Sequence, residues 1–115
     1  MLESTIVNAK ITDTFFGIED HGIMTFMLYL RFDNYNQGYG GYALDQQRLN
    51  GTRVGCGVGI TVVRKILETI GVHKWEDLPG CFVRVKRTGQ KIEALGNIME
   101  DKWVSLEQIF KEELK

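Results

Sequence analysis

Residues 23–32 read Ile-Met-Thr-Phe-Met-Leu-Tyr-Leu-Arg-Phe, and this stretch decides the fold class. Its side chains fall into two sets, with Phe26, Leu28, Leu30 and Phe32 on one face and Met27, Tyr29 and Arg31 on the other. Alternation with period two over this length is typical of an antiparallel strand that buries one face. The sequence therefore predicts a half-buried strand here, and the rest of the chain can be placed around it.

Weaker strand signals lie on both sides of this stretch. Residues 4–16 predict a strand with Val7, Ala9 and Ile11 on one face, and the glycine-bounded segment 17–22 predicts a hairpin loop or a bulged turn. Residues 33–38 have turn chemistry, and residues 39–44 predict a third strand that its glycines weaken. Residues 46–52 are expected to form a loop.

A helix is predicted next, over residues 58–70. Its apolar residues recur at helical spacing and predict one core-facing stripe, formed by Ile60, Val63, Leu67 and Ile70. Gly71 is a plausible end for this helix. In the connector that follows, Trp75 and Leu78 are expected to cap the core.

The last part of the chain predicts a hairpin and a short helix. Strands are expected over residues 82–87 and 91–98, with a turn between them, and Ser105 is expected to cap a C-terminal helix. The predicted fold is α+β, with an antiparallel sheet of β-hairpins and with one main helix and a short C-terminal helix packed on one face. We expect a single domain spanning residues 1–115.

Composition narrows the choice of partners. The chain has 14 basic and 15 acidic residues and a net charge of -1, so global charge predicts neither a nucleic-acid polymer nor an acidic membrane as its partner. The chain has no long apolar run and no signal-peptide pattern, which predicts a cytoplasmic protein without a membrane segment. Cys56 and Cys81 fit no metal-ligand spacing, and we expect two reduced, buried thiols.

Catalytic chemistry has one candidate in the sequence, the acid–histidine run Glu19-Asp20-His21. A general acid–base role is one interpretation. The run has no nucleophile or second histidine near it in the sequence, which favours a structured turn. His73 is expected to be a surface or packing residue. The sequence therefore predicts neither an enzyme nor a metal site, and no cofactor.

Anion binding is a second kind of candidate. Arg53 is followed by Gly55, Gly57 and Gly59, which lead into the predicted helix. Backbone N–H groups at a glycine-rich helix start can bind phosphate, although a flexible loop entering a close-packed helix explains the same residues. Arg84 and Lys86 add positive charge to one strand, which a solvated edge strand would also explain.

The aromatic residues of segment 35–42 offer a surface for stacking. Tyr39 and Tyr42 alternate with glycines and are candidates to stack on a nucleobase. The same segment could instead form an aromatic edge strand or face a partner chain. These alternatives stay open from the residues alone.

Several segments of the chain resemble a widespread family of small phage and prophage proteins. They are residues 17–23 (Gly-Ile-Glu-Asp-His-Gly-Ile), 37–45 (Gln-Gly-Tyr-Gly-Gly-Tyr-Ala-Leu-Asp), 74–80 (Lys-Trp-Glu-Asp-Leu-Pro-Gly), 96–98 (Gly-Asn-Ile) and 101–103 (Asp-Lys-Trp). The chain is similar to the phage anti-defence sponges that block the Thoeris system. This resemblance implies a non-enzymatic protein that sequesters cyclic ADP-ribose-type or cyclic oligonucleotide signals without cleaving them. It also implies a homodimer or larger homo-oligomer in the host cytoplasm, with ligand pockets at chain interfaces.

The resemblance assigns no ligand residue one by one, so the candidates rest on chemistry alone. Phosphate is expected at Arg53, Gly55 and Gly57, with Arg84 and Lys86 adding charge and Tyr39 or Tyr42 stacking on the base. The alternative function is a phage inhibitor that blocks a host defence complex by protein–protein contact, as anti-CRISPR proteins do. An enzyme that uses His21 and Asp20 is the third hypothesis.

Overall fold

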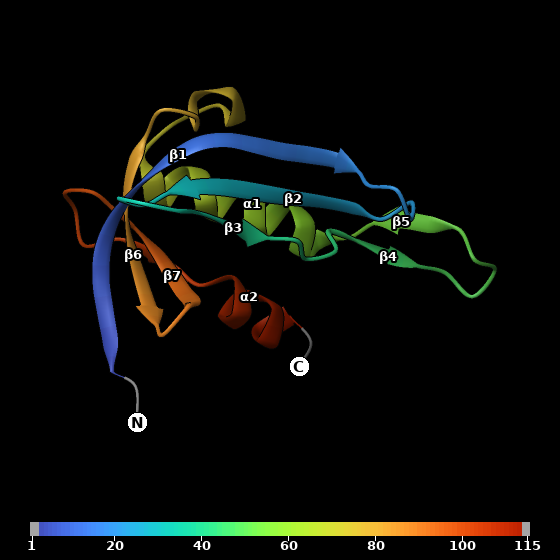
Figure 1. Cartoon of the computed structure of the whole chain (residues 1–115). Helices are drawn as coiled ribbons and strands as arrows, with labels where there is room; N and C mark the ends of the chain where they lie inside the picture. Colours follow the sequence, from blue (N-terminus) through green and yellow to red (C-terminus); the bar gives the residue numbers. More distant parts are fainter. Residues whose placement is uncertain (1–2, 114–115) are drawn as a thin grey trace.

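The computed structural model describes residues 3–113. Its main feature is a six-stranded antiparallel sheet (Figure 1). The strand order is β3-β2-β1-β6-β7-β8. These strands are β1 (Ser4–Ile18), β2 (Met24–Arg31), β3 (Asn36–Gly40), β6 (Phe82–Thr88), β7 (Lys91–Asn97) and β8 (Trp103–Val104). With the two helices described below, this is the α+β fold that the sequence predicts, and β2 lies where the alternating stretch places it.

Strand β1 joins the two halves of the sheet. Its first half pairs with β6 along residues 4–10, and its second half pairs with β2 along residues 10–18. A bulge between Ile11 and Asp13 interrupts the pairing with β2. Bulges bend a strand and increase its twist, and β1 curves accordingly across the molecule (Figure 1).

The core fills the concave face of this sheet. Phe26, Leu28 and Leu30 of β2 are fully buried, as predicted, and they share the core with inward residues of β1 and β6. Helices α1 (Gly57–Ile70) and α2 (Leu106–Glu113) close it with Val62, Ile66 and Leu106. No helix within residues 3–113 is both long enough and apolar enough to cross a bilayer.

The predicted stripe of α1 is only partly right, because Leu67 and Ile70 pack against the core but Ile60 does not. The buried residues are Gly59, Val62, Ile66 and Thr69, whereas Ile60 is 71% exposed. A Cβ atom at Gly59 would lie 2.4 Å from the Leu44 carbonyl oxygen, so the helix meets the chain most closely on its glycine side. This close contact directs Val62 and Ile66 to the core and turns Ile60 outward.

Other boundaries also differ from the prediction. Strand β3 starts earlier than expected and ends at Gly40 and Gly41, whose φ angles of 137° and 82° disfavour residues with a side chain. Residues 48–52 form a loop, as expected, but residues 46 and 47 belong to a strand, and the loop joins β4 (Asp45–Gln47) to β5 (Arg53–Gly55) in a hairpin that extends away from the sheet (Figure 1). These strands and β8 are too short to show alternation.

The connector and the second hairpin agree with the sequence. Leu78 is fully buried beside the 3-10 helix η1 (Trp75–Asp77), and the Trp75 ring packs edge-on against Phe16 and Phe26. Strands β6 and β7 form the expected hairpin. The Ser105 hydroxyl accepts a hydrogen bond from the Gln108 N–H at 3.3 Å, as an N-cap of α2 does.

Candidate functional site

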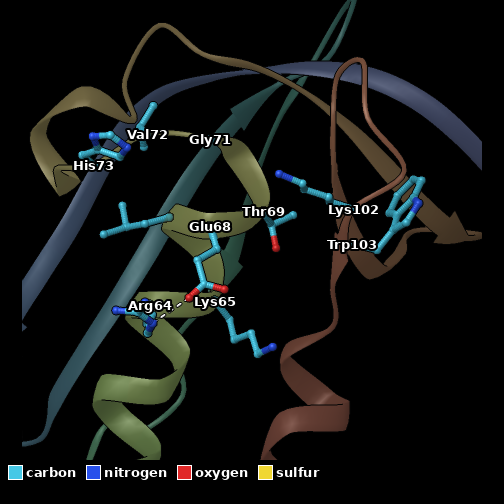
Figure 2. A pocket seen from close by; sticks show the side chains of 10 residues that line it. Arg64, Lys65, Glu68, Thr69, Gly71, Val72, His73, Lys102 and Trp103 are labelled. Carbon is cyan, nitrogen blue, oxygen red and sulfur yellow. Dashed lines mark ion pairs between the residues drawn. The ribbon is translucent and has the colours of Figure 1, made fainter.

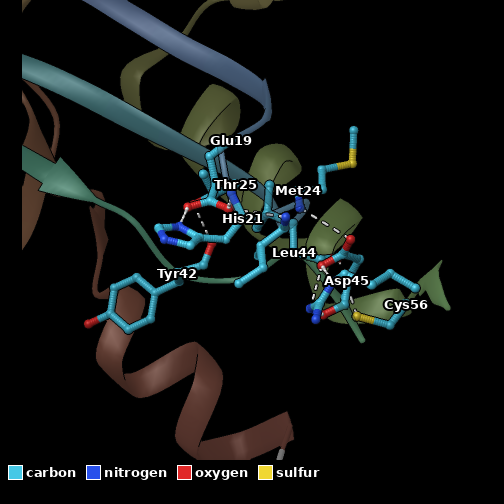
Figure 3. Close-up of polar contacts among 10 residues, drawn as sticks. Glu19, His21, Met24, Thr25, Tyr42, Leu44, Asp45 and Cys56 are labelled. Carbon is cyan, nitrogen blue, oxygen red and sulfur yellow. Dashed lines mark hydrogen bonds and ion pairs between the residues drawn. The ribbon is translucent and has the colours of Figure 1, made fainter. Parts of the chain in front are cut away.

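Arg53 is held by an ion pair at the base of the β4–β5 hairpin. Its Nε and Nη2 atoms donate to Oδ1 of Asp45 at 3.0 and 2.7 Å. This hydrogen bonding raises the pKa of Arg53 and lowers the pKa of Asp45. The other carboxylate oxygen of Asp45 accepts the Met24 N–H at 3.2 Å, which fastens the hairpin to β2 (Figure 3). The guanidinium expected to bind phosphate is therefore engaged within the fold.

The glycines at the start of α1 have different surroundings. A Cβ atom at Gly55 or Gly57 would meet nothing within 4 Å, so space does not require glycine at either position. Gly59 is a packing residue, as described above. Cys56, the N-cap residue, donates through Sγ to the Leu44 carbonyl at 3.3 Å. Cys56 and Cys81 are both free thiols, and they are only partly buried, in contrast to the expected full burial.

The two candidate tyrosines are used in packing. Tyr39 is 8% exposed, and its hydroxyl accepts the Leu106 N–H at 3.1 Å. Burial raises the pKa of Tyr39 to about 12. The ring of Tyr42 stacks on Phe110 with centroids 4.6 Å apart and planes 12° apart. The prediction that Tyr39 stacks on a base is therefore wrong for this conformation, because the core covers its ring.

Arg84 and Lys86 lie on the outer face of β6, because Val83 and Val85 point into the core. Arg84 donates to the carbonyls of Asn97 and Glu100, each at 2.7 Å, and its guanidinium lies 4.8 Å above the Trp103 ring. Lys86 is exposed. Arg53 lies at the base of the β4–β5 hairpin, and Tyr42 packs against α2. A single chain therefore does not bring Arg84 and Lys86 together with Arg53 and Tyr42.

The acid–histidine run forms a structured turn. Glu19 accepts backbone N–H groups from His21 at 2.6 Å and from Ile23 at 3.2 Å, and its second oxygen lies 2.9 Å from Nδ1 of His21 (Figure 3). The hydrogen bond between the two side chains lowers the pKa of Glu19 and raises that of His21. The Glu19 carboxylate is thus occupied in shaping the turn.

A groove that the sequence analysis missed lies between the second half of α1 and the start of β8 (Figure 2). Its volume is about 860 Å³. It is lined by Arg64, Lys65, Leu67, Glu68 and Thr69 of α1, by Gly71, Val72 and His73 after the helix, and by Lys102 and Trp103. Residues from α1 and from β8 are distant in the sequence, so no local motif could have indicated this groove.

Positive charge dominates the groove. Three cationic side chains line it, those of Arg64, Lys65 and Lys102, against the single carboxylate of Glu68. Arg64 pairs with Glu68 at 2.6 Å, and Lys102 pairs with Glu100 at 2.8 Å. Within residues 3–113, no ion pair engages Lys65. All of these charged side chains are exposed, so they are free to rearrange around a ligand.

The backbone carbonyls at the C-terminal end of α1, which lies in this groove, already accept hydrogen bonds from the protein. The Asn97 side-chain amide donates to the carbonyls of Thr69 and Ile70 at 3.0 and 3.2 Å, and the Gly71 N–H donates to Leu67 at 2.8 Å. The last turn of α1 contains no basic residue, so the groove cations are not needed to cap this helix end.

The comparisons with known proteins add no relative. No protein-family model, curated protein or solved structure was found to match this chain. Within residues 3–113, no group of three His, Cys, Asp or Glu side chains is placed to hold a metal ion.

Proposed function

We propose that the protein is a phage anti-defence sponge, a non-enzymatic protein that sequesters a cyclic ADP-ribose-type or cyclic oligonucleotide signal in the host cytoplasm. The observation that carries this proposal is the basic groove between α1 and β8. Its volume of about 860 Å³ falls in the range of small-ligand sites, and its excess positive charge suits a compact anion. The sequence resemblance points to the same class of ligand.

The weak pairing of the groove cations favours capture of a phosphate. Exposed ion pairs contribute little free energy, because water screens them and long side chains lose freedom in forming them. A ligand phosphate can therefore displace Glu68 from Arg64 and Glu100 from Lys102 at small cost. Lys65 forms no ion pair within residues 3–113, so a ligand phosphate displaces no carboxylate there. Arg64 can grip two phosphate oxygens, whereas each lysine supplies a point charge.

Capture without cleavage agrees with the chemistry that the groove offers. Its carboxylate, Glu68, pairs with Arg64, and its histidine, His73, makes no ion pair or side-chain hydrogen bond within residues 3–113 that would position it as a base. The acid–histidine pair Glu19–His21 belongs to a turn and does not line the groove. Hydrolysis of a phosphodiester needs a positioned base or nucleophile. A sponge needs only favourable contacts, and the groove lysines and arginine supply these.

Calorimetry with a panel of cyclic ADP-ribose isomers and cyclic oligonucleotides tests the proposal. We expect wild type to bind at least one member, and we expect Lys65→Glu/Lys102→Glu to weaken binding by at least about tenfold, or about 1.4 kcal/mol. The matched control is Arg48→Glu/Lys10→Glu, which makes the same charge change outside the groove and should leave affinity unchanged. Mass spectrometry of heat-released ligand should return it intact.

Two results would contradict this proposal. One is a well-folded wild-type protein that binds no member of the panel. The other is an equal loss of affinity in the groove variant and the control, which would mean that net charge alone attracts the ligand.

The alternative function, a protein inhibitor of a host defence complex, is favoured by the β4–β5 hairpin. This hairpin extends from the body and carries Leu49, fully exposed, at its tip (Figure 1). A single apolar anchor on a projecting ribbon suits a pocket on a protein partner. If the protein acts this way, Leu49→Asp should abolish coelution with the host target without changing the melting temperature or any ligand binding.

A further inference from the structure

Arg87 is stacked on two aromatic rings at the end of the sheet. Its guanidinium carbon lies 5.0 Å from the ring centroid of Phe32 and 5.5 Å from that of Tyr35. The two rings are themselves stacked, with centroids 4.8 Å apart and planes 11° apart. The three side chains, here called the Arg87 cluster, come from β6 and from the turn between β2 and β3.

Arg87 differs in its polar contacts from the arginines that make ion pairs or hydrogen bonds within the fold. Arg53 and Arg64 each pair with a carboxylate, and Arg84 donates to two backbone carbonyls. Arg87 is half-buried, yet no ion pair found within residues 3–113 includes it. No buried side-chain nitrogen within residues 3–113 lacks a hydrogen-bond partner, so the guanidinium nitrogens of Arg87 reach solvent and are accessible to an anionic ligand.

The fold holds the cluster in place from several sides. Arg87 lies on the same face of β6 as the buried Val83 and Val85, and it pairs with Ile92, a core residue, so its side chain is on the inner side of the sheet. The Phe32 N–H donates to the Tyr35 carbonyl at 2.9 Å, which closes the turn that bears both rings. The Gln37 side-chain amide donates to the Gln90 carbonyl at 2.8 Å and ties this turn to the β6–β7 hairpin.

A preorganised guanidinium beside an exposed ring has a definite binding chemistry. A guanidinium presents its N–H donors at its edge in a fork that matches two oxygens of a phosphate. Phe32 is 5% exposed, whereas Tyr35 is 38% exposed and can still offer ring surface. Aromatic rings stack on nucleobases in a sequence-tolerant way.

We propose that the Arg87 cluster is a binding site for a phosphate carried by a planar ring, as in a nucleoside monophosphate. The phosphate supplies the charge that Arg87 lacks, and the base stacks on Tyr35. None of the three cluster residues lines the groove between α1 and β8, so this site is separate from the one assigned to the proposed function. It can exist whether or not the groove binds a signal.

Nuclear magnetic resonance of the Arg87 Nε–H group in the full chain tests the site, with inorganic phosphate and adenosine 5′-monophosphate as probes. We expect both probes to shift this resonance, and we expect the nucleotide to bind at least about tenfold more tightly than phosphate. Tyr35→Leu should reduce nucleotide affinity to that of phosphate. Arg87→Lys lacks the reporter group, so calorimetry measures its affinities; both probes should bind more weakly, because an ammonium cannot form the fork.

The control is Arg31→Lys, the same change at an exposed arginine of β2, and it should leave both affinities unchanged. The groove variant Lys65→Glu/Lys102→Glu should keep the Arg87 response, which separates this site from the groove. If Arg87→Lys fails to fold, the phosphate and nucleotide affinities of wild type and of Tyr35→Leu still test the proposal. An Arg87 resonance that neither probe moves, or a nucleotide preference that survives Tyr35→Leu, would overturn the proposal.

Discussion

Leu28 and Tyr29 are consecutive residues of β2 that face opposite sides of the sheet. Leu28 is fully buried, and Tyr29 is 42% exposed. Leu28→Ala should lower the free energy of unfolding by about 2–5 kcal/mol, because it removes core contacts and leaves a cavity. Tyr29→Ala should cost clearly less. A denaturant melt measures both, and the reverse order would mean that the two faces are exchanged.

Gly59 and Gly57 allow a matched test of helix packing. A Cβ atom at Gly59 would lie 2.4 Å from a backbone oxygen of Leu44, whereas one at Gly57 would meet nothing within 4 Å. Gly59→Ala should destabilise the fold by about 1–3 kcal/mol, the usual cost of overpacking. Gly57→Ala should be neutral or stabilise by up to about 1 kcal/mol, because it restricts the unfolded chain. Equal melting temperatures for the two variants would contradict the close approach of α1 to Leu44.

At the scale of elements, Tyr39 links β3 to the start of α2. Its hydroxyl accepts the Leu106 N–H, and burial raises its pKa from 10.0 to about 12. Between these values the unfolded state has lost the Tyr39 proton while the folded state keeps it, so stability must fall as pH rises. The loss should reach about 2–3 kcal/mol by pH 12.

Chemical denaturation at a series of pH values above 9 measures this effect. Tyr39→Phe removes the titrating group, and its stability should fall less steeply with pH than that of wild type. Tyr42→Phe is the matched control, because the Tyr42 ring is only partly buried on the surface of α2. Parallel pH profiles for wild type and Tyr39→Phe would show that Tyr39 ionises equally in both states.

The sequence predicts the faces of β1 and β2 because strand alternation depends only on neighbours two residues apart. It misplaces part of the face of α1, because hydrophobicity counts Gly59 and Thr69 as neutral or polar, whereas both are buried, with Gly59 close to the Leu44 carbonyl. Tyr39 was misjudged for a similar reason. Its glycine neighbours suggested an open edge, but α2, which is distant in the sequence, covers it.

The candidate site was harder to predict than the fold. The groove cations Lys65 and Lys102 come from α1 and from the segment just before β8, and the Arg87 cluster joins β6 to the turn after β2. Neither set forms a motif along the chain. Arg53 and its glycines did form one, yet Asp45 already occupies the guanidinium. Residue type indicated which side chains can bind an anion. Only the fold shows which of those side chains are already paired within the protein.

At the scale of the whole molecule, the sheet has one covered face and one uncovered face. Both helices pack on the concave face, so the outer face carries exposed apolar side chains. Phe15, Met27 and Tyr29 lie together on adjacent strands of this face, because Phe15 pairs with Met27 and Asp13 pairs with Tyr29. We call these three residues the outer patch. Strand β3, the edge of the sheet beside it, presents glycines there.

We expect a second copy of the chain to cover the outer patch. Asp13 and Arg31 lie at its margin on neighbouring strands, so a two-fold axis through the patch can place each carboxylate near the partner's guanidinium. An aromatic patch beside an uncovered sheet edge is a surface that proteins commonly bury by pairing. Light scattering at micromolar concentration should return at least twice the chain mass of 13.1 kDa.

Variants distinguish this interface from other surfaces of the chain. Phe15→Asp/Tyr29→Lys should give a folded monomer, because both residues are exposed and neither supports the core. Ile60→Asp, an equally disruptive change on the exposed side of α1, should leave the assembly intact. A wild-type monomer throughout the micromolar range would exclude the dimer. An assembly that Phe15→Asp/Tyr29→Lys leaves unchanged would place the contact on another face.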